Sequence, residues 1–454
     1  MSFKAPFTLL ELAVKSLLRN EALAISTLQK LPMELFPSLF KEAFKSRHMK
    51  ILTAMVAEWP FSCLPVGALM QVPDVVILQA VLDGVDMLLI QNVHLRKSKL
   101  RVLDLRNVHH VFWDAWPGIE CGESSTGTLS KEQTGNCLNR YALRQLLKVV
   151  TDFDLRTHLN EQQAYLLQWA QQQKGSVRLC CMKVTICDTP MKIIKMFFSI
   201  FQPCYIEELE LSTGWTPAAL SCFARCFGQM RNLRKLHLAR IYVNTKKAVN
   251  SLEDIEEKYT TELNSYSFLR CLKSPLESLS IKLSEFSQSD LEHLCRCQRL
   301  FQLKHLTLCG VVLFNLCPAL LQFLLENVAA TLQILELEDC GIGDSQLSAL
   351  LPALSQCLQL TRVNFYDNVI SISVLMDLLQ ILANLSKLTE EFYPAPMECY
   401  DDLGNVQVNK FASVCPDLLD ILRAKRQPIR VTFATDICLK CHQRCALWIS
   451  ETVD

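Results

Sequence analysis

The sequence has no excess charge of either sign, and it has no long uninterrupted apolar run. Lys plus Arg and Asp plus Glu are equal at 46 each in 454 residues, which argues against a protein held to nucleic acid or anionic lipid by its net charge. The most hydrophobic stretch, residues 75–90, carries two aspartates and does not reach membrane-spanning length. The start lacks the basic, apolar and small-residue order of a signal peptide. We therefore expect a protein of the cytoplasm and nucleus, with no membrane and no direct nucleic-acid partner.

The sequence also lacks the motifs of common enzyme sites. It has no phosphate-binding glycine loop, no paired-histidine metal motif and no nucleophile elbow. We therefore predict a non-catalytic protein that needs no cofactor. In a reducing compartment the 21 cysteines are expected to be free thiols that pack as small apolar groups.

A repeated LxxLxL pattern runs through the second half of the chain. The clearest copies are residues 303–308, 332–337 and 360–365. The central apolar residue of each copy falls at Met182, Leu209, Leu236, Leu279, Leu306, Leu335, Val363 and, in degenerate form, Leu388. The one long gap, between Leu236 and Leu279, holds the charged residues 246–266, which we interpret as an insertion. An earlier copy at residues 100–105 precedes a polar stretch, residues 118–136, that we expect to be a long loop.

The spacing of the copies, 25 to 29 residues outside the long gap, fits one short strand and one helix in each repeat. Neither element can bury its apolar side alone, so neighbouring repeats stack. The fold class predicted is α/β: a leucine-rich-repeat solenoid, or horseshoe, with strands on the concave face, helices on the convex face and an N-terminal helical cap. Residues beside the strand leucines point away from the core. The predicted substrate-binding residues are therefore Glu210, His237, Thr307, Glu336, Glu338 and Asn364.

Four segments follow from this pattern. Residues 1–95 form the N-terminal helical cap, and residues 96–175 hold the first repeat-like strand, the polar loop and a helical region. Residues 176–400 hold the leucine-rich repeats, with the charged insertion at about 242–268. Residues 401–454 form a C-terminal cap and a cysteine-containing tail.

Two short motifs stand near the N-terminus. Thr8 and Glu11 form a capping box at the start of a helix, and Thr8, Leu9, Ala13 and Leu17 resemble an elongin-binding box with Ala where Cys is usual. Leu31, Pro32 and Leu35 resemble the Leu-Pro-x-x-Leu element that selects a cullin-2 scaffold. The alternative is that these helices only cap the exposed end of the repeat core.

The tail contains Cys438, Cys441, His442 and Cys445. Three cysteines and a histidine could supply the four ligands of a tetrahedral zinc site, but the sequence favours a reduced, partly exposed tail.

Four LxxLL segments, at residues 143–147, 321–325, 347–351 and 375–379, have the form of nuclear-receptor boxes. Helices of a repeat protein need leucines at these offsets to pack, so we expect them to be buried.

Several longer segments resemble the PRAME family, the preferentially expressed antigen in melanoma and its germline-expressed relatives. They are residues 21–25, 31–37, 58–65, 81–84, 100–106, 178–181, 339–342, 365–368 and 371–373, so the likeness covers nearly the whole chain. The resemblance implies a leucine-rich solenoid and expression in germ or early embryonic cells. It also implies regulation of transcription, differentiation, apoptosis and proliferation.

The resemblance further implies the substrate-recognition subunit of a cullin-2 RING E3 ubiquitin ligase, which would recruit a target protein for proteasomal degradation. The expected partners are elongin B/C, cullin-2 with its RING subunit, and an unknown protein substrate. The alternative is a ligase-independent binding module, such as a transcriptional corepressor of retinoic-acid signalling that contacts transcriptional regulators.

Overall fold

The computed structural model describes residues 8–70, 72–95, 99–108, 111–113, 146–212, 214, 223–241, 267–284, 286–437 and 442–450. They form two compact units. Unit one comprises the described residues of Met1–Asp154, His158–Met182 and Lys192–Gln202, and unit two those of Leu155–Thr157, Lys183–Met191 and Pro203–Asp454. No helix in these ranges is long and apolar enough to cross a membrane.

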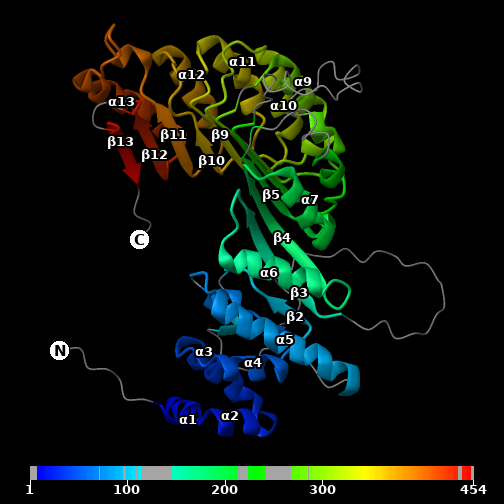
Figure 1. Ribbon diagram of the computed structural model, residues 1–454. Coiled ribbons are helices and arrows are strands. Elements are labelled where there is room, and N and C mark those ends of the chain that lie inside the picture. The colour runs from blue at the N-terminus through cyan, green and yellow to red at the C-terminus, as the bar shows by residue number, and fades with distance from the viewer. Residues whose placement is uncertain are drawn as a thin grey trace, which may run out of the picture. The chain divides into compact units, whose positions relative to one another are not determined.

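Unit one begins with helices and then adds short parallel strands (Figure 1). Its helices are α1 (Leu9–Leu18), α2 (Glu21–Thr27), α3 (Phe36–Lys45), α4 (Met49–Ala57), α5 (Val75–Leu95), α6 (Glu161–Gln172) and most of α7 (Met191–Ile200), with short turns η1 (Leu28–Lys30), η2 (Met33–Leu35), η3 (Gly67–Leu69) and η4 (Val111–Trp113). Its strands are β1 (Cys63–Leu64), β2 (Val102–Asp104), nearly all of β3 (Lys148–Leu155) and the first half of β4 (Arg178–Cys187). β1 pairs with β2 and β2 with β3, all in parallel.

An aromatic cluster forms part of the core of unit one. Trp59 packs edge-on against Phe36 and Phe40, and Trp113 stacks on Phe40. Both indole nitrogens are satisfied, because Trp59 donates to the Cys63 carbonyl and Trp113 to the Pro65 carbonyl. Trp59 is buried and Trp113 is half-buried. Neither indole leaves an unpaired donor, and an unpaired donor in a core would cost free energy.

Gly84 lets α4 and α5 approach closely. A Cβ at this position would lie 2.5 Å from the Thr53 carbonyl oxygen and 2.7 Å from Val56 Cβ. The Thr53 hydroxyl also donates to the Ala80 carbonyl across the same contact at 2.8 Å. Any larger residue at position 84 would push the two helices apart.

Unit two alternates strands with helices (Figure 1). Its strands are the second half of β4, then β5 (Glu208–Ser212), β6 (Lys235–Ala239), β7 (Ser278–Lys282), β8 (His305–Cys309), β9 (Ile334–Glu338), β10 (Arg362–Asn364), β11 (Glu390–Pro394), β12 (Arg430–Ala434) and β13 (Ala446–Ser450). Its helices are α9 (Gln288–Arg296), α10 (Pro318–Val328), α11 (Asp344–Leu354), α12 (Ile372–Leu382) and α13 (Val408–Arg423), with short turns η5 (Pro203–Tyr205), η8 (Ser267–Cys271), η9 (Gln298–Leu300) and η10 (Met397–Cys399).

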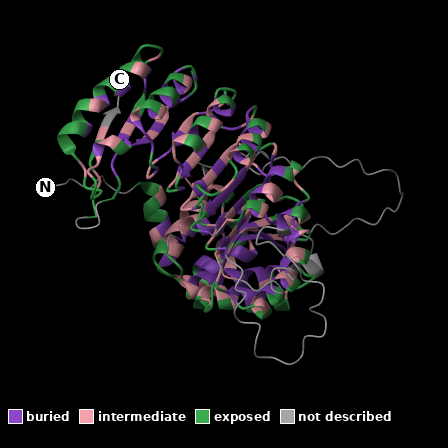
Figure 2. Ribbon diagram, turned by 90° about the horizontal axis from the view of Figure 1, so that it is seen from above, coloured by how far each residue is buried: buried purple, intermediate pink, exposed green. Residues whose placement is uncertain are grey.

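The register of the strands confirms the leucine-rich-repeat solenoid. β4 to β12 pair in parallel, and one buried column joins Leu209, Leu236, Leu279, Leu306, Leu335 and Val363. Helices α9 to α13 pack side by side on the side of the sheet to which this buried column points. Buried residues gather on the strands and on the helix sides that face them (Figure 2).

Two of the predicted repeat positions are wrong. Val184, and not Met182, pairs with Leu209, so the first copy is displaced by two residues. Glu391, and not Leu388, pairs with Val363, so a charged residue occupies the core column of the last LxxLxL copy.

Asn368 and Cys340 bond the turning backbone that follows the strands. Asn368 is buried and donates to the carbonyls of Leu337, Phe365 and Tyr366 while its carbonyl oxygen accepts from Cys340 and Ile342. The Cys340 thiol donates to the carbonyls of Leu308 and Glu338. These bonds satisfy backbone groups that the turn after the strand removes from the sheet.

β13 ends the sheet of unit two. It runs antiparallel to β12, whereas β4 to β12 are parallel to one another.

The predicted loop at residues 118–136 and the charged residues 246–266 lie outside the described residues. The boundaries of the four predicted segments stay predictions.

Candidate functional site

The strand face of unit two, opposite its helices, carries a continuous row of outward side chains. We call it the central row. Its members pair in register across the strands: Thr185, Glu210, His237, Ser280, Thr307, Glu336, Asn364, Phe392 and Thr432. Each lies between two buried strand residues, so its side chain points away from the core. All are half-buried except Ser280 and Asn364, which are buried.

The structure brings five of the six predicted substrate-binding residues into the central row. Glu210, His237, Thr307, Glu336 and Asn364 belong to it, and Glu338 lies two residues further along β9. Asn364 is the one buried residue among these six. Its amide donates to Glu338 at 2.9 Å, and its carbonyl oxygen accepts from the Tyr366 backbone at 3.0 Å. It positions Glu338 on this face.

The first strands of unit two carry a mixed charge network. Glu208 lies 2.6 Å from Lys183 and 3.6 Å from Lys235. Burial favours a raised pKa for Glu208, but the hydrogen bond and charge of Lys183 outweigh it and lower that pKa. Burial lowers the pKa of His237, although Glu208 and Glu210 oppose the shift. This shift favours the neutral form of His237, which offers one hydrogen-bond donor and one acceptor.

The last strands combine arginines with aromatic rings. The guanidinium groups of Arg362 and Arg430 lie 5.1 Å and 5.6 Å from the centroid of the Phe392 ring. Glu390 pairs with both arginines, at 3.2 Å and 3.3 Å, and Arg362 also lies 3.1 Å from Glu336. This end of the face presents an aromatic ring held between two partly neutralised cations.

Arg444 is a residue of this face that the sequence analysis missed. It comes from the tail, and its guanidinium binds Asp367, approaches Glu338 at 3.7 Å and lies 5.1 Å from the centroid of the Tyr366 ring. These contacts raise the pKa of Arg444 above its usual value. Because its partners lie far away in the sequence, only the pairing of β13 with β12 could have indicated this position.

The N-terminal helices of unit one form a second candidate surface. The capping box of α1 is confirmed, since Thr8 accepts from the Glu11 backbone at 3.2 Å and its own backbone donates to the Glu11 carboxylate at 2.8 Å. Of the four predicted elongin-box residues, Thr8, Leu9 and Ala13 are exposed and Leu17 is half-buried. Leu9 is 86% exposed.

The predicted cullin-binding residues follow α2 in the same unit. Pro32 is exposed, and Leu31 and Leu35 are half-buried. Pro32 precedes η2, and α3 begins at Phe36 with a proline in its first turn. The Leu-Pro-x-x-Leu element is thus a bend between two helical segments, with its proline at the surface.

Comparison with known proteins identifies the family. A model described as the PRAME N-terminal domain matches residues 6–113, and one described as the PRAME C-terminal domain matches residues 147–452. The chain belongs to the PRAME family. The resemblance in the sequence is thereby confirmed. The central row lies in the PRAME C-terminal domain and the helical surface in the PRAME N-terminal domain.

Individual PRAME-family relatives match almost end to end. PRAME family member 12 of Homo sapiens is 43% identical over 97% of this chain and 95% of the relative. PRAME family member 8 of Homo sapiens is 42% identical over 97% of each protein. Oogenesin-3 of Mus musculus is 41% identical over 97% of this chain and 92% of its own length. None of these three names describes an enzyme.

The cysteine cluster of this PRAME-family tail is only partly described. Cys438 and Cys441 lie outside the described residues, while His442 and Cys445 are exposed. Within the part of the chain that the structure covers, no three His, Cys, Asp or Glu residues are grouped to hold a metal ion. A zinc site made by Cys438, Cys441, His442 and Cys445 therefore stays an untested alternative.

The LxxLL segments that are fully described have nearly all their leucines buried. Leu321, Leu324 and Leu325 of α10 are buried, as are Leu347 and Leu350 of α11, whereas Leu351 is half-buried. Leu375, Leu378 and Leu379 of α12 are completely buried. The prediction that these leucines are buried is confirmed for all of them except Leu351.

Proposed function

We propose that this chain is the substrate-recognition subunit of a cullin-2 RING E3 ubiquitin ligase. The N-terminal helices would bind elongin B/C and cullin-2, and the strand face of unit two would hold a target protein. Ubiquitin transfer would belong to the partner subunits, so this chain would be non-catalytic and would act in the cytoplasm and nucleus. Regulation of transcription, differentiation, apoptosis and proliferation would follow from which target is degraded.

The observation that carries the proposal is the exposure of Leu9. A helix that only capped the core would turn its apolar residues inward, as α1 does with Val14 and Leu18. Leu9 and Leu12 instead remain 86% and 49% exposed although the helix is well capped. Burying one leucine side chain stabilises a complex by about 1.5–3 kcal/mol. The outward apolar side of α1 is therefore better explained by a partner than by the fold.

Exposed apolar side chains continue on the next elements. Leu23 and Ile25 of α2 and Met33 of η2 are also exposed. α2 packs on both α1 and α4, so its outward residues are not needed to hold the helices together. An adaptor that covers this region would gain apolar contacts from several elements, as stable interfaces require.

The test is direct binding with purified proteins. We expect the chain to bind elongin B/C, and Leu9→Ser to weaken that binding by about tenfold to a hundredfold, the loss that one buried leucine predicts. Leu35→Ser should keep elongin binding and lose cullin-2 recruitment. Ile90→Ser is the matched control, because Ile90 is an exposed apolar residue on α5 of the same unit, outside both boxes.

The contrary result is equally clear. If the wild-type chain does not bind elongin B/C, the boxes belong to a structural cap and the ligase proposal fails. The chain would then be a ligase-independent binding module, such as a transcriptional corepressor. Its partners should then co-purify equally with wild type and with the Leu9→Ser variant.

A further inference from the structure

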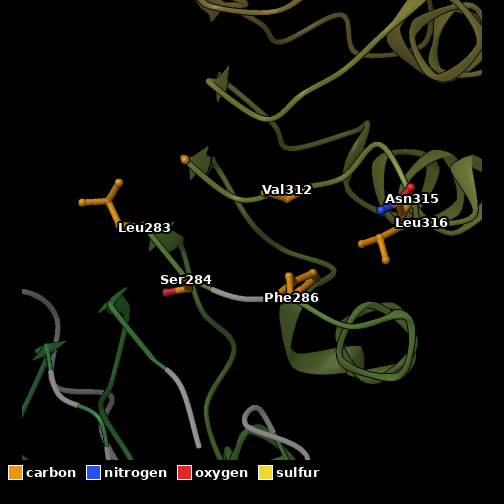
Figure 3. A pocket seen from close by; sticks show the side chains of 7 residues that line it. Leu283, Ser284, Phe286, Val312, Asn315 and Leu316 are labelled. Carbon is orange, nitrogen blue, oxygen red and sulfur yellow. The ribbon is translucent and has the colours of Figure 1, made fainter.

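A hollow opens beside the loops that follow β7 and β8. Its volume is about 460 Å³, and it is lined by Leu283, Ser284, Phe286, Gly310, Val312, Asn315 and Leu316. In Figure 3, Leu283 and Ser284 lie at the strand end, Val312 lies on the next loop, and Leu316 and Phe286 lie on the helix side. We call it the rim hollow. It belongs to neither surface of the proposed function.

Leu283 is unusual for its backbone position. Its φ is +47°, in the left-handed region that bulky side chains disfavour. The equivalent positions after neighbouring strands hold residues that tolerate this region or point freely into solvent: Asp188, Arg240, Gly310, Asp339 and Asp367, all with positive φ. Among these described positions leucine is the apolar exception, and its side chain remains 58% exposed. Packing in the core therefore does not account for it.

Neighbouring residues complete an apolar wall at the surface. Val312 is 54% exposed, and Leu283 Cδ2 lies 2.7 Å from where a Cβ at Gly310 would be. Gly310 thus leaves room for the leucine to cover the strand end. Ser284 contributes no free polar group, because its hydroxyl donates to the Lys282 carbonyl and accepts from the Ile241 backbone. A strained leucine and an exposed valine together make an apolar wall that solvent alone does not favour.

The flank toward β6 is basic. The Arg240 backbone donates to the Lys282 carbonyl at 3.0 Å, and the Leu283 backbone donates to the Cys309 carbonyl at 2.8 Å, so these residues follow one another along the rim. Arg240 and Lys282 are exposed. Among the residues that the structure describes, neither forms an ion pair. Two exposed cations beside an apolar hollow match a ligand with carboxylates next to a bulky apolar side chain.

We propose that the rim hollow docks an extended peptide segment of a partner protein. A leucine, methionine or phenylalanine of the peptide enters the hollow, and acidic residues beside it face Arg240 and Lys282. The exposed Asn315 amide supplies a donor and an acceptor for the peptide backbone. The volume is in the range of sites that hold a small ligand. The site operates whether or not the chain joins a ubiquitin ligase.

The test is selection of a phage-displayed random peptide library on the full chain, with Leu283→Asp as the counter-selected variant. Aspartate already occupies the equivalent left-handed positions at 339 and 367, so this variant should fold at least as well as wild type, which thermal unfolding by circular dichroism verifies. We expect the selected peptides to share a bulky apolar residue with acidic neighbours. A fluorescein-labelled peptide of that sequence should lose about tenfold or more in affinity for the Leu283→Asp variant.

Further variants separate the parts of the proposal. Lys282→Glu should lower the affinity for the peptide but keep the preference for a bulky apolar residue. Val312→Ser also changes the apolar wall, and it replaces Leu283→Asp if that variant does not fold. Leu358→Asp, which changes an exposed leucine elsewhere in unit two, should bind the peptide as wild type does.

Three outcomes would overturn the proposal. The first is a selection with no apolar and acidic consensus, or peptides that bind wild type and Leu283→Asp equally. The second is concentration-dependent dimerisation in sedimentation velocity that Leu283→Asp abolishes, since the occupant would then be a second copy of this chain. The third is binding to anionic phosphatidylserine vesicles that depends on Leu283, since the hollow would then contact lipid.

Discussion

Glu391 occupies a core position that neighbouring repeats fill with apolar residues. It pairs in register with Val363 on one side and Val431 on the other, and it is completely buried. Its carboxylate lies 2.5 Å from Arg426 Nη2 and accepts from the Tyr393 hydroxyl at 2.6 Å. Burial raises the pKa of Glu391, and the Arg426 charge opposes that shift. The stability of this repeat therefore depends on one buried ion pair.

Arg426→Met should lower the free energy of unfolding by about 3–5 kcal/mol, because it leaves a buried carboxylate without its cation. The triple variant Arg426→Met, Glu391→Leu and Tyr393→Phe should return to within about 1 kcal/mol of wild type, since an apolar group can replace a buried pair. Its third change matches Phe433, which pairs with Tyr393 on the neighbouring strand.

The loss should depend on pH with a definite sign. The fold favours the protonated form of Glu391, because burial raises its pKa, and removing Arg426 raises that pKa further. The variant should therefore be least destabilised below the ordinary pKa of a glutamate, and it should lose stability as the pH rises through the raised value. The triple variant lacks this titration and should not show the slope.

Urea unfolding followed by far-ultraviolet circular dichroism, at about pH 5 and about pH 8, measures both effects. Arg423→Met is the matched control, because Arg423 lies on the exposed side of α13 and, among the described residues, forms an ion pair only with exposed Asp420, at 3.4 Å. That control should change stability by less than about 0.5 kcal/mol. Wild-type stability in Arg426→Met at both pH values would refute the argument, as would a triple variant no more stable than the single one.

Three further outcomes follow from other contacts. Asn368→Ala should cost about 2–4 kcal/mol in urea unfolding, because it leaves several buried backbone groups of one turn unpaired. Gly310→Ala should cost about 1–2 kcal/mol in the same assay, because the position has a φ of +63° and Leu283 already fills the space of a Cβ. Arg444→Ala should speed proteolytic cleavage of the tail, seen by mass spectrometry, because the tail loses its pair with Asp367.

The leucine column of unit two was predictable because the strand leucines recur at nearly constant spacing. The first copy was misplaced because β4 is apolar in two registers. Leu179, Met182 and Val184 fit the pattern, and so do Cys181, Val184 and Ile186, the last three being completely buried. Only the pairing of Val184 with Leu209 decides between them. A local pattern contains no information about a partner strand.

The last copy failed for a different reason. A search for apolar residues cannot place Glu391 in a core column, and the arginine that neutralises it stands 35 residues later. The early strands β1 and β3 were also missed, since β1 has only two residues and neither carries the LxxLxL pattern. Residues 100–105 were found, and β2 lies within them.

The central row was largely predictable because outward positions on a strand follow from a period of two. The charges on that face were not, because their meaning depends on neighbouring strands. Glu208, Glu277 and Glu390 each pair with two cations from different strands or loops. Because these carboxylates are paired with cations, the face carries many charged groups, as the whole chain does with its zero net charge.

Paired surface ions also bear on how the protein selects a partner. Each exposed ion pair contributes only about 0–1 kcal/mol to stability. The charged groups of a target can therefore replace the present partners of these side chains at little cost in free energy. Such a face selects a target by the pattern of its charges and adds little to the affinity. Affinity then has to come from apolar residues that the fold leaves exposed, such as Leu9 at the N-terminal helices and Leu283 at the rim hollow. We expect Leu9→Ser to reduce adaptor binding, and Leu283→Asp to reduce peptide binding, by a larger factor than charge reversals on the central row reduce target binding.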